Sequence, residues 1–420
     1  MQRNNIVSII NIISIFFVRM LGLFIMLPIL SPYLHQMQND QHFSLYLIGL
    51  TVGCYGLTQA IFQIPFGILS DYFGRKSVIV LGLVFFGVGS VIAGFFDNIW
   101  GILLGRSLQG VGAISGPLIA LLSDLSTEQQ RPKYMAFLGI SIGVSFIISF
   151  IIGPYLSTVF SISKIFYFIA ISSGFMIMSL FYMQKDNEIV ISNKYIKLDK
   201  QLLKQFFKNK DLNLMYGSIF ALHAILTINF IVIPIKFSLL DISANIQVYY
   251  YSKVFLLSCV FLILVFSFKR IKALNLTTKK IILLSWAFVL LSELILFFAL
   301  NSNDAGTLEL LLSGLIIFFS GFNILEAFFP SIASSVCDVN LRGSTMGIYS
   351  SFQFLGPFVG GIASGILMSK IGLSAALISG ILLSIFCLLL SFSLSSNLLE
   401  KKSEIKTDKA DDLIVDERLI

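Results

Sequence analysis

The sequence predicts an all-α, polytopic membrane protein with twelve transmembrane helices in two six-helix bundles. The first observation behind this prediction is composition. Of the 420 residues, 56% are hydrophobic and only 12% are charged, and the mean hydropathy is +0.90. An average soluble domain carries about 25% charged residues, so this chain cannot cover a water-facing surface. A cytosolic enzyme, a disordered protein and a secreted disulfide scaffold are therefore excluded. The net charge of +7 is small beside the apolar bulk, so we expect no nucleic-acid partner.

The second observation is the number of apolar stretches. A helix that crosses a bilayer needs about 20 mostly apolar residues. The first stretch is too long for a signal peptide and is followed by no small-residue cleavage site, so we expect it to be retained as a helix. Twelve stretches qualify, at residues 9–31, 46–67, 77–96, 99–121, 134–158, 165–183, 213–235, 249–268, 281–300, 310–335, 345–368 and 374–395.

The third observation is the distribution of charge. If both termini are cytoplasmic, most of the 29 Lys and Arg residues fall on the cytoplasmic side, and the outer loops hold only Lys164, Lys236 and Lys370. This asymmetry follows the positive-inside rule. We therefore predict a multi-pass protein of the cell inner (plasma) membrane with both termini in the cytoplasm.

The predicted organisation divides the chain into two halves. Residues 1–183 form an N-terminal six-helix bundle and residues 213–395 a C-terminal one. A lysine-rich cytoplasmic linker, 184–212, joins them, and 396–420 form a charged cytoplasmic tail. A weak internal repeat supports two equivalent halves, because Gly110, Arg131 and Met135 recur at the same intervals as Gly321, Arg342 and Met346.

The chain has none of the usual signatures of catalysis or cofactor binding. It contains no G-x-x-x-x-G-K-[ST] loop, its three histidines are scattered and its four cysteines form no C-x-x-C pair. We therefore expect no enzyme activity, no cofactor and no metal site. A secondary transporter, a channel or a membrane scaffold remains, and the ring of identical charges typical of a channel is absent.

The loop after the second stretch carries the most specific motif, with Gly67, Asp71, Gly74, Arg75 and Lys76 at fixed spacing. Glycine allows the tight chain reversal, and an aspartate can accept hydrogen bonds from a neighbouring helix N-terminus. An ordinary positive-inside loop would need the two cations but not the aspartate or the glycines. We interpret the motif as an ionic latch.

This loop resembles the G-x-x-x-D-x-x-G-R-K signature of the major facilitator superfamily. Residues 104–112 resemble the fourth-span motif of that family, and we expect Arg106, Gln109 and Gly110 to share one helix face with Ala113 and Pro117. Two further pairs are similar to the antiporter motif of its drug/proton exchangers, Gly153-Pro154 in the fifth stretch and Gly356-Pro357 in the eleventh.

The resemblance implies a drug/proton antiporter-type exporter. It implies that Asp71, Arg75 and Asp124 form a cytoplasmic charge relay that stabilises the outward-open state. The glycine motifs imply close helix packing at Gly110, Gly153 and Gly356, with rocking of the halves as its consequence. The relative that the chain resembles along the whole membrane region has a further C-terminal soluble domain, which we do not expect here.

Ionisable residues within the apolar stretches are functional candidates, because a charge at mid-bilayer costs at least ~2.5–3.5 kcal/mol. Lys253 is near a span end and can extend to the membrane surface. We expect Glu293 to be structural, or protonated and shielded from lipid, rather than to take part in transport. The remaining candidates are Arg19, Arg106, His223 and Glu326.

Glu326 shares a helix face with Asn323 and Pro330, and an apolar surrounding favours the neutral form of a carboxyl group. Glu326 and His223 are therefore candidates for proton coupling, although His223 could instead be a neutral core histidine bonded to a hydroxyl such as that of Thr227. Arg19 needs a counter-charge or several carbonyl partners, and with no acid inside the first six spans it either pairs with Glu326 or binds an anionic group of the substrate. Several drug/proton exchangers keep an acid in the first span, and this chain does not.

These observations predict a monomeric, proton-coupled exporter of small molecules in which two halves alternate about a central site. The alternative is uptake of a small metabolite, anionic if Arg19 binds it, by symport or facilitated diffusion. The predicted cavity comprises Arg19, Arg106, Gln109, His223, Asn323, Glu326 and Gln353.

Overall fold

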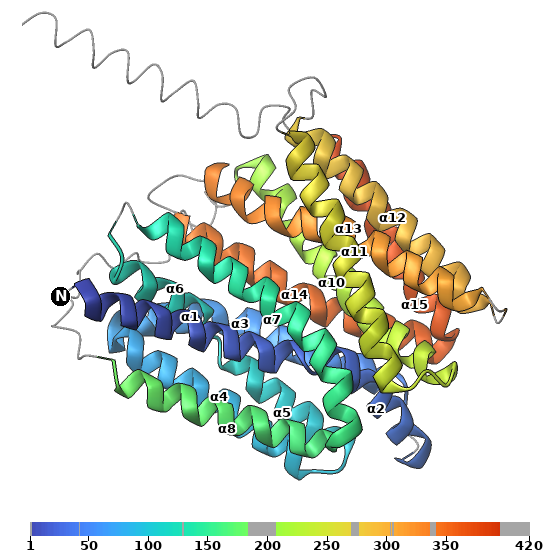
Figure 1. Ribbon diagram of the computed structural model, residues 1–420, viewed down its shortest axis with the longest axis horizontal. Helices are drawn as coiled ribbons and strands as arrows, with labels where there is room; N and C mark the ends of the chain where they lie inside the picture. The colour runs from blue at the N-terminus through green and yellow to red at the C-terminus, as the bar shows by residue number, and fades with distance from the viewer. Residues whose placement is uncertain are drawn as a thin grey trace, which may run out of the picture.

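In the computed structural model, every regular element of the described residues is a helix (Figure 1). The described residues are 2–41, 43–127, 130–183, 207–269, 277–302, 304, 306–336 and 342–394. Most of the predicted linker and tail therefore lies outside them. The helices are α1 (Gln2–Phe24), α2 (Leu27–Gln41), α3 (Tyr46–Phe73), α4 (Arg75–Phe95), α5 (Ile99–Val111), α6 (Ser115–Asp124), α7 (Arg131–Val159), α8 (Ile162–Phe181), α10 (Lys210–Leu239), α11 (Ala244–Lys269), α12 (Thr278–Asn301), α13 (Thr307–Val336), α14 (Arg342–Lys370) and α15 (Ala376–Ser391).

The predicted spans correspond to these helices. Within the described residues, eleven segments are long and apolar enough to cross a membrane. The remaining predicted span, 249–268, lies in α11. Lys236, which we expected in an outer loop, instead belongs to the last turn of α10, where its Nζ donates to the carbonyls of Leu300 (3.3 Å) and Ser302 (3.2 Å) near the end of α12.

Two spans are broken, which the sequence analysis did not predict. The first passes from α1 to α2 at residues 25–26, and the fourth passes from α5 to α6 at residues 112–114. Each break precedes a proline in the first turn of the following helix, Pro28 or Pro117, whose ring nitrogen cannot continue the preceding hydrogen-bond ladder. We had predicted that Ala113 and Pro117 share a helix with Arg106. This prediction is wrong, because Arg106 belongs to α5, Ala113 to the break and Pro117 to α6.

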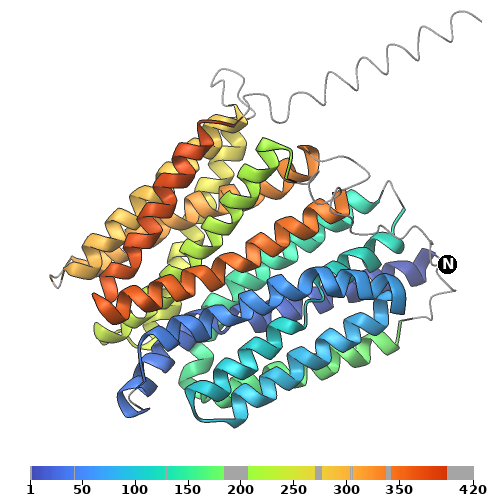
Figure 2. The same ribbon diagram turned by 180° about the vertical axis from the view of Figure 1, so that it is seen from behind.

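The helices form two bundles (Figures 1 and 2). In the N-terminal bundle α4 packs against α5 and α8, α3 against α5, and α1 against α7; in the C-terminal bundle α10 packs against α14, and α12 against α13 and α15. The bundles meet where α3 packs on α14, α2 on α10 and α7 on α11. We name the two ends of the molecule after residues in their turns, the Gly74 end and the Gly372 end.

Glycines allow the closest contact between the bundles, where α3 crosses α14. A methyl group at Gly49 would overlap the carbonyl oxygen of Gly361, and one at Gly56 would overlap that of Phe354. A methyl at Gly53 would lie 2.8 Å from the carbonyl oxygen of Pro357. The backbones can therefore approach only because these positions lack side chains.

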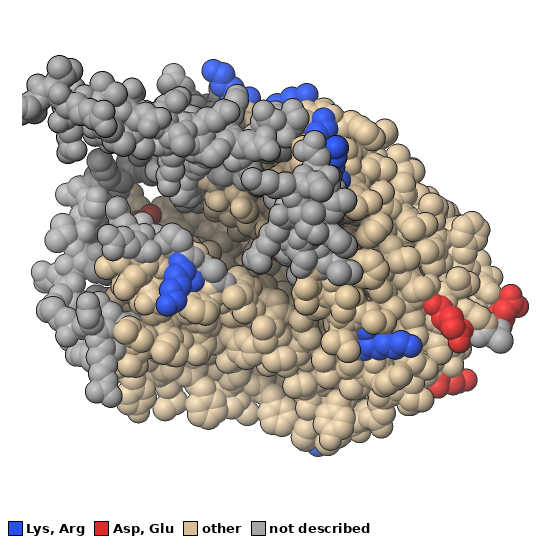
Figure 3. Space-filling view, turned by 45° about the horizontal axis from the view of Figure 1, so that its top comes forward, with Lys and Arg blue, Asp and Glu red and all other residues tan. Residues whose placement is uncertain are grey.

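Aromatic rings join α7 to the C-terminal bundle. The ring centroids of Phe150 and Phe230 are 4.2 Å apart, and those of Phe150 and Phe255 are 5.5 Å apart. Phe146 extends the contact to Phe319, at 6.0 Å. These rings and the α3–α14 contact lie toward the Gly372 end. The surface is hollowed between the bundles near the centre of Figure 3, which brings the top of Figure 1 forward.

Candidate functional site

Three polar side chains from three helices of the C-terminal bundle meet. The His223 Nε2 on α10 lies 3.1 Å from the Glu326 Oε2 on α13. The Gln353 Nε2 on α14 lies 2.9 Å from both the Glu326 Oε1 and the His223 Nε2. We call these three residues the polar triad. All three were predicted as cavity residues, and the structure brings them into direct contact.

The neighbours of the polar triad differ in part from those expected. The Thr227 hydroxyl donates to the backbone carbonyl of His223 (3.0 Å) and leaves the imidazole to Glu326 and Gln353, so the alternative of a hydroxyl-bonded ring is wrong. Asn323 Nδ2 donates to the Ser258 Oγ on α11 (3.3 Å) and does not join the triad. The edge of the Phe322 ring faces His223 at 5.8 Å.

Arg19 on α1 is 0% exposed and is surrounded by neutral groups. Its Nη2 lies 3.1 Å from the Tyr55 Oη, 2.8 Å from the Gln59 Oε1 and 2.8 Å from the carbonyl oxygen of Gly112. The break between α5 and α6 exposes that carbonyl to the arginine. No contact joins Arg19 to Glu326, so the ion pair that we considered from the sequence is not formed.

Arg106 and Gln109 form a second buried polar group in the same bundle. Arg106 Nη1 donates to the Gln109 Oε1 (2.8 Å), and the Gln109 Nε2 donates to the Ser90 Oγ on α4 (2.7 Å). The Arg106 Cζ lies 4.9 Å from the centroid of the Tyr55 ring. Tyr55 therefore contacts both buried guanidinium groups, one through its hydroxyl and one through its ring.

The sequence analysis assigned no role to Tyr55 and Gln59, although a signal was present. Tyr55, Gln59 and Gln63 recur every four residues in an apolar stretch, which places them on one face of α3. The structure links them, because the Gln59 Nε2 donates to the Gln63 Oε1 at 3.1 Å. A polar stripe of this kind predicts a buried partner, which here is Arg19.

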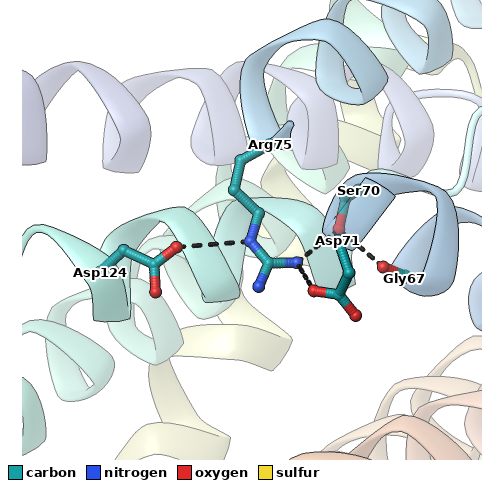
Figure 4. Close-up of polar contacts among 5 residues, drawn as sticks. All are labelled: Gly67, Ser70, Asp71, Arg75 and Asp124. Carbon is teal, nitrogen blue, oxygen red and sulfur yellow. Dashed lines mark hydrogen bonds and ion pairs between the residues drawn. The ribbon is translucent and has the colours of Figure 1, made fainter. Parts of the chain in front are cut away.

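The predicted latch residues gather at the Gly74 end (Figure 4). Arg75 pairs with Asp71 through Nη1 and with the Asp124 Oδ2 through Nε, at 3.3 Å. Its Nη1 also donates to the Ser70 Oγ (2.7 Å), whose hydroxyl donates to the carbonyl of Gly67 (2.7 Å). These residues come from α3, α4 and α6, so all belong to the N-terminal bundle.

The turn before α4 has the conformation that the motif predicts. Gly74 has φ +86°, in the region that favours glycine, and it lies between the end of α3 and the start of α4. This turn brings Arg75 back onto Asp71. Lys76 follows in the first turn of α4 and is half-buried.

The predicted packing residues lie at close helix contacts. A methyl at Gly110 would overlap the carbonyl of Tyr55, and one at Gly356 would overlap that of Phe220 on α10. A methyl at Gly153 would lie 2.9 Å from the carbonyl oxygen of Ile25, at the break between α1 and α2. The following prolines, Pro154 and Pro357, lie within α7 and α14.

No group of three or more His, Cys, Asp or Glu residues in the described part of the chain is positioned to hold a metal ion. The arrangement offers instead a protonatable cluster in one bundle, buried arginines in the other and an ion-pair network at one end.

Comparison with known proteins identifies the family. Residues 12–361 match the model of the Major Facilitator Superfamily. An uncharacterized transporter of Buchnera aphidicola subsp. Acyrthosiphon pisum is 40% identical over 348 residues, 82% of this chain and 86% of that protein. The inner membrane transport protein YajR of Escherichia coli is 35% identical over 355 residues, 84% of this chain and 75% of that protein.

More distant proteins share the fold or part of the sequence. The D-xylose-proton symporter has a similar structure, with a TM-score of 0.68 at 13% identity over 90% of this chain and 97% of the other. Multidrug resistance protein 1 of Bacillus subtilis is 30% identical over 209 residues, 49% of this chain and 52% of that protein. The chain is therefore a multi-pass membrane transporter and not an enzyme, and it belongs to the major facilitator superfamily.

Proposed function

We propose that this transporter exports small molecules in exchange for protons, by alternating access between its two bundles. The observation that carries the proposal is the polar triad. Three helices of one bundle place a carboxyl, an imidazole and an amide within hydrogen-bonding distance, and no cation pairs with Glu326 apart from His223 among the described residues. Such a group can bind or release a proton without a permanent ion pair to oppose the change.

The donors and acceptors of the polar triad support a proton on the Glu326 carboxyl. An amide nitrogen only donates, so the His223 Nε2 that meets Gln353 accepts. The Glu326 Oε2 contacts the same nitrogen and then needs a hydrogen of its own. If the amide is turned, its oxygen meets the Glu326 Oε1, which again requires a hydrogen on the carboxyl. A protonated Glu326 meets all three contacts when the amide is turned, because the carboxyl hydrogen then goes to the amide oxygen and the His223 Nε2–H is shared between that oxygen and the Glu326 Oε2.

Charge supports a cytoplasmic position for the Gly74 end. Arg75, Lys76 and Lys280 lie in turns or first helical turns at that end, whereas Asp304 and Glu309 lie near the opposite one. In Figure 3 several Lys and Arg side chains lie along the top, and most of the visible Asp and Glu side chains gather at the lower right, beside one basic side chain. The positive-inside rule then makes the conformation inward-facing, with both termini in the cytoplasm.

The latch acts, in this proposal, when the Gly74 end closes. Asp71, Arg75 and Asp124 all lie in one bundle, so their mutual ion pairs cannot by themselves hold two bundles together. The closed state requires a partner from the C-terminal bundle. The start of α14 is the candidate, because α14 packs along α3 and begins at the end where α3 stops. A helix N-terminus would attract the Asp71 carboxylate.

The test is proton-driven exchange in proteoliposomes. The Glu326→Gln variant keeps the size and hydrogen-bonding ability of the side chain but cannot ionise. We expect it to lose acceleration by a pH gradient, while substrate counterflow without a gradient continues. The matched control is Glu309→Gln, an exposed glutamate on the same helix, which should behave as wild type. Normal gradient-driven exchange in Glu326→Gln would refute the coupling assignment.

A second candidate function is uptake of a small anionic metabolite. It is favoured by Arg19, whose partners in the structure are all neutral and whose Nε lacks a partner. Counterflow against a panel of organic anions and lipophilic cations separates the two functions. Saturable exchange of anions that Arg19→Met removes would favour uptake, and exchange of lipophilic cations alone would favour export.

A further inference from the structure

A second buried carboxyl group lies away from the polar triad. Glu293 on α12 is 0% exposed, and its Oε1 accepts a hydrogen bond of 2.7 Å from Asn229 Nδ2 on α10. Gly380 on α15 leaves room for it, because a methyl group there would overlap the Glu293 Oε2. Asn229 follows His223 by six residues, which is about 9 Å along α10 and on a different face. Three helices therefore enclose Glu293 outside the triad.

No cation balances this carboxyl. α15 contains no Asp, Glu, Lys or Arg, and the lysines of α12 lie in its first turn, about 20 Å along the helix. No ion pair with Glu293 forms within the described part of the chain. The charged or titratable side chains in the middle and outer part of the neighbouring helices α10 and α13 are His223, Lys236, Glu309 and Glu326.

The polar atoms of the pair show where a proton is needed. The Glu293 Oε2 and the Asn229 Oδ1 are both buried without a hydrogen-bond partner. Both atoms are acceptors if the carboxyl is ionised, so they cannot serve each other. A hydrogen on the Oε2 makes it a donor, and the Asn229 Oδ1 is then the acceptor on the side chain that already bonds Glu293. Turning the amide leads to the same requirement, because its oxygen would then face the carboxyl.

We propose that Glu293 is a proton-binding site that remains occupied in the folded protein. In its neutral form it pairs with Asn229 through two hydrogen bonds, as a carboxylic acid pairs with a carboxamide, and ties α10 to α12. The site is independent of the proton coupling proposed for the triad. It makes α10 move with α12 while His223, on another face of α10, remains available to Glu326.

Infrared spectroscopy of the purified full-length protein tests the proposal. We expect wild type at neutral pH to show a carbonyl band of a protonated carboxyl that Glu293→Gln removes and Glu326→Gln retains. The band should shift only slowly after transfer to D₂O, because the group is enclosed. Identical wild-type and Glu293→Gln spectra in this region would show that Glu293 is ionised and would overturn the proposal.

A second measurement uses stability. A carboxyl that is protonated when folded and ionised when unfolded releases a proton on unfolding, so wild type should lose stability as the pH rises from about 5 to 8. Glu293→Gln should lose less over the same range, and Glu309→Gln should follow wild type. Equal slopes for wild type and Glu293→Gln would contradict the proposal.

If Glu293→Gln does not fold, Asn229→Leu provides the test, because it keeps the acid and removes its partner. The carboxyl band should then persist at the frequency of a weakly bonded acid. Its absence would refute the proposal. Neither result depends on transport activity, so this proposal and the proposed function can fail separately.

Discussion

The polar clusters of the two bundles contain different kinds of ionisable side chain. The N-terminal bundle encloses Arg19 and Arg106, whose guanidinium groups keep their charge at any physiological pH. The C-terminal bundle holds the fully buried Glu293 and the partly exposed Glu326 and His223, whose charge depends on whether each carries a proton. The difference indicates a division of labour. In the proposed mechanism, one bundle carries fixed charge and the latch, and the other carries the groups that bind protons.

The largest expected effect on stability comes from Arg19, and it would sharpen this comparison. Arg19→Met removes the donor to the carbonyl of Gly112 and to the Tyr55–Gln59 pair. The Ile114 amide still donates to the Gly112 carbonyl and the Tyr55 hydroxyl to the Gln59 Oε1, so no acceptor is left empty. The variant nevertheless loses hydrogen bonds to a charged group, which contribute about 1.5–3 kcal/mol, and should melt at a lower temperature. Its transport should keep the pH dependence of wild type, because the proposed proton-binding groups lie in the other bundle. A changed pH dependence would contradict the assignment of proton binding to the C-terminal bundle.

A smaller effect is expected from Gln353. The Gln353→Leu variant removes the donor shared by Glu326 and His223. A hydrogen bond contributes about 1.5–3 kcal/mol to an ionised carboxyl and about 1 kcal/mol to a neutral one, so its loss should favour the protonated form. The pH at which exchange is half-maximal should rise by up to about one unit. The control is Gln247→Leu, a buried glutamine near the start of α11 that bonds a backbone carbonyl. An unchanged pH profile in Gln353→Leu would place the proton elsewhere.

The smallest effect on stability is expected at the latch. Arg75 and its partners are partly exposed, and ion pairs of this kind contribute at most about 1 kcal/mol, so Arg75→Gln should unfold nearly as wild type does. Spin-label distances across the Gly74 end should nevertheless shift toward the open state, because the Asp71 side chain loses its orientation. Lys164→Gln, at the opposite end, should leave the distances unchanged. An unaltered distribution in Arg75→Gln would remove the latch from the mechanism.

The sequence predicted the spans and the candidate residues better than their contacts. Charge and hydropathy are local properties, so the twelve stretches and the loop at Asp71 could be identified directly. The breaks before Pro28 and Pro117 were missed because an apolar run does not show where its helix is interrupted. Spacing suggested that Asn323 accompanies Glu326, but its side chain bonds to Ser258 on α11.

The partners of Arg19 could not be predicted from its own helix. A buried guanidinium needs a counter-charge or several neutral acceptors. The acid that the sequence analysis considered as the partner of Arg19 was Glu326. The structure instead supplies Tyr55, Gln59 and the Gly112 carbonyl, the last of which is available only because α5 ends there. Which acceptors meet a buried cation depends on the packing of three helices, which a single sequence does not specify.

The most direct test of this division of labour is a count of protons bound by the purified protein. A pH-indicator titration between about pH 5 and 8 would compare wild type, Arg19→Met and the double variant His223→Gln/Glu326→Gln. We predict that the double variant binds fewer protons over this range, whereas Arg19→Met titrates as wild type. Equal proton uptake by the double variant and wild type would contradict the account.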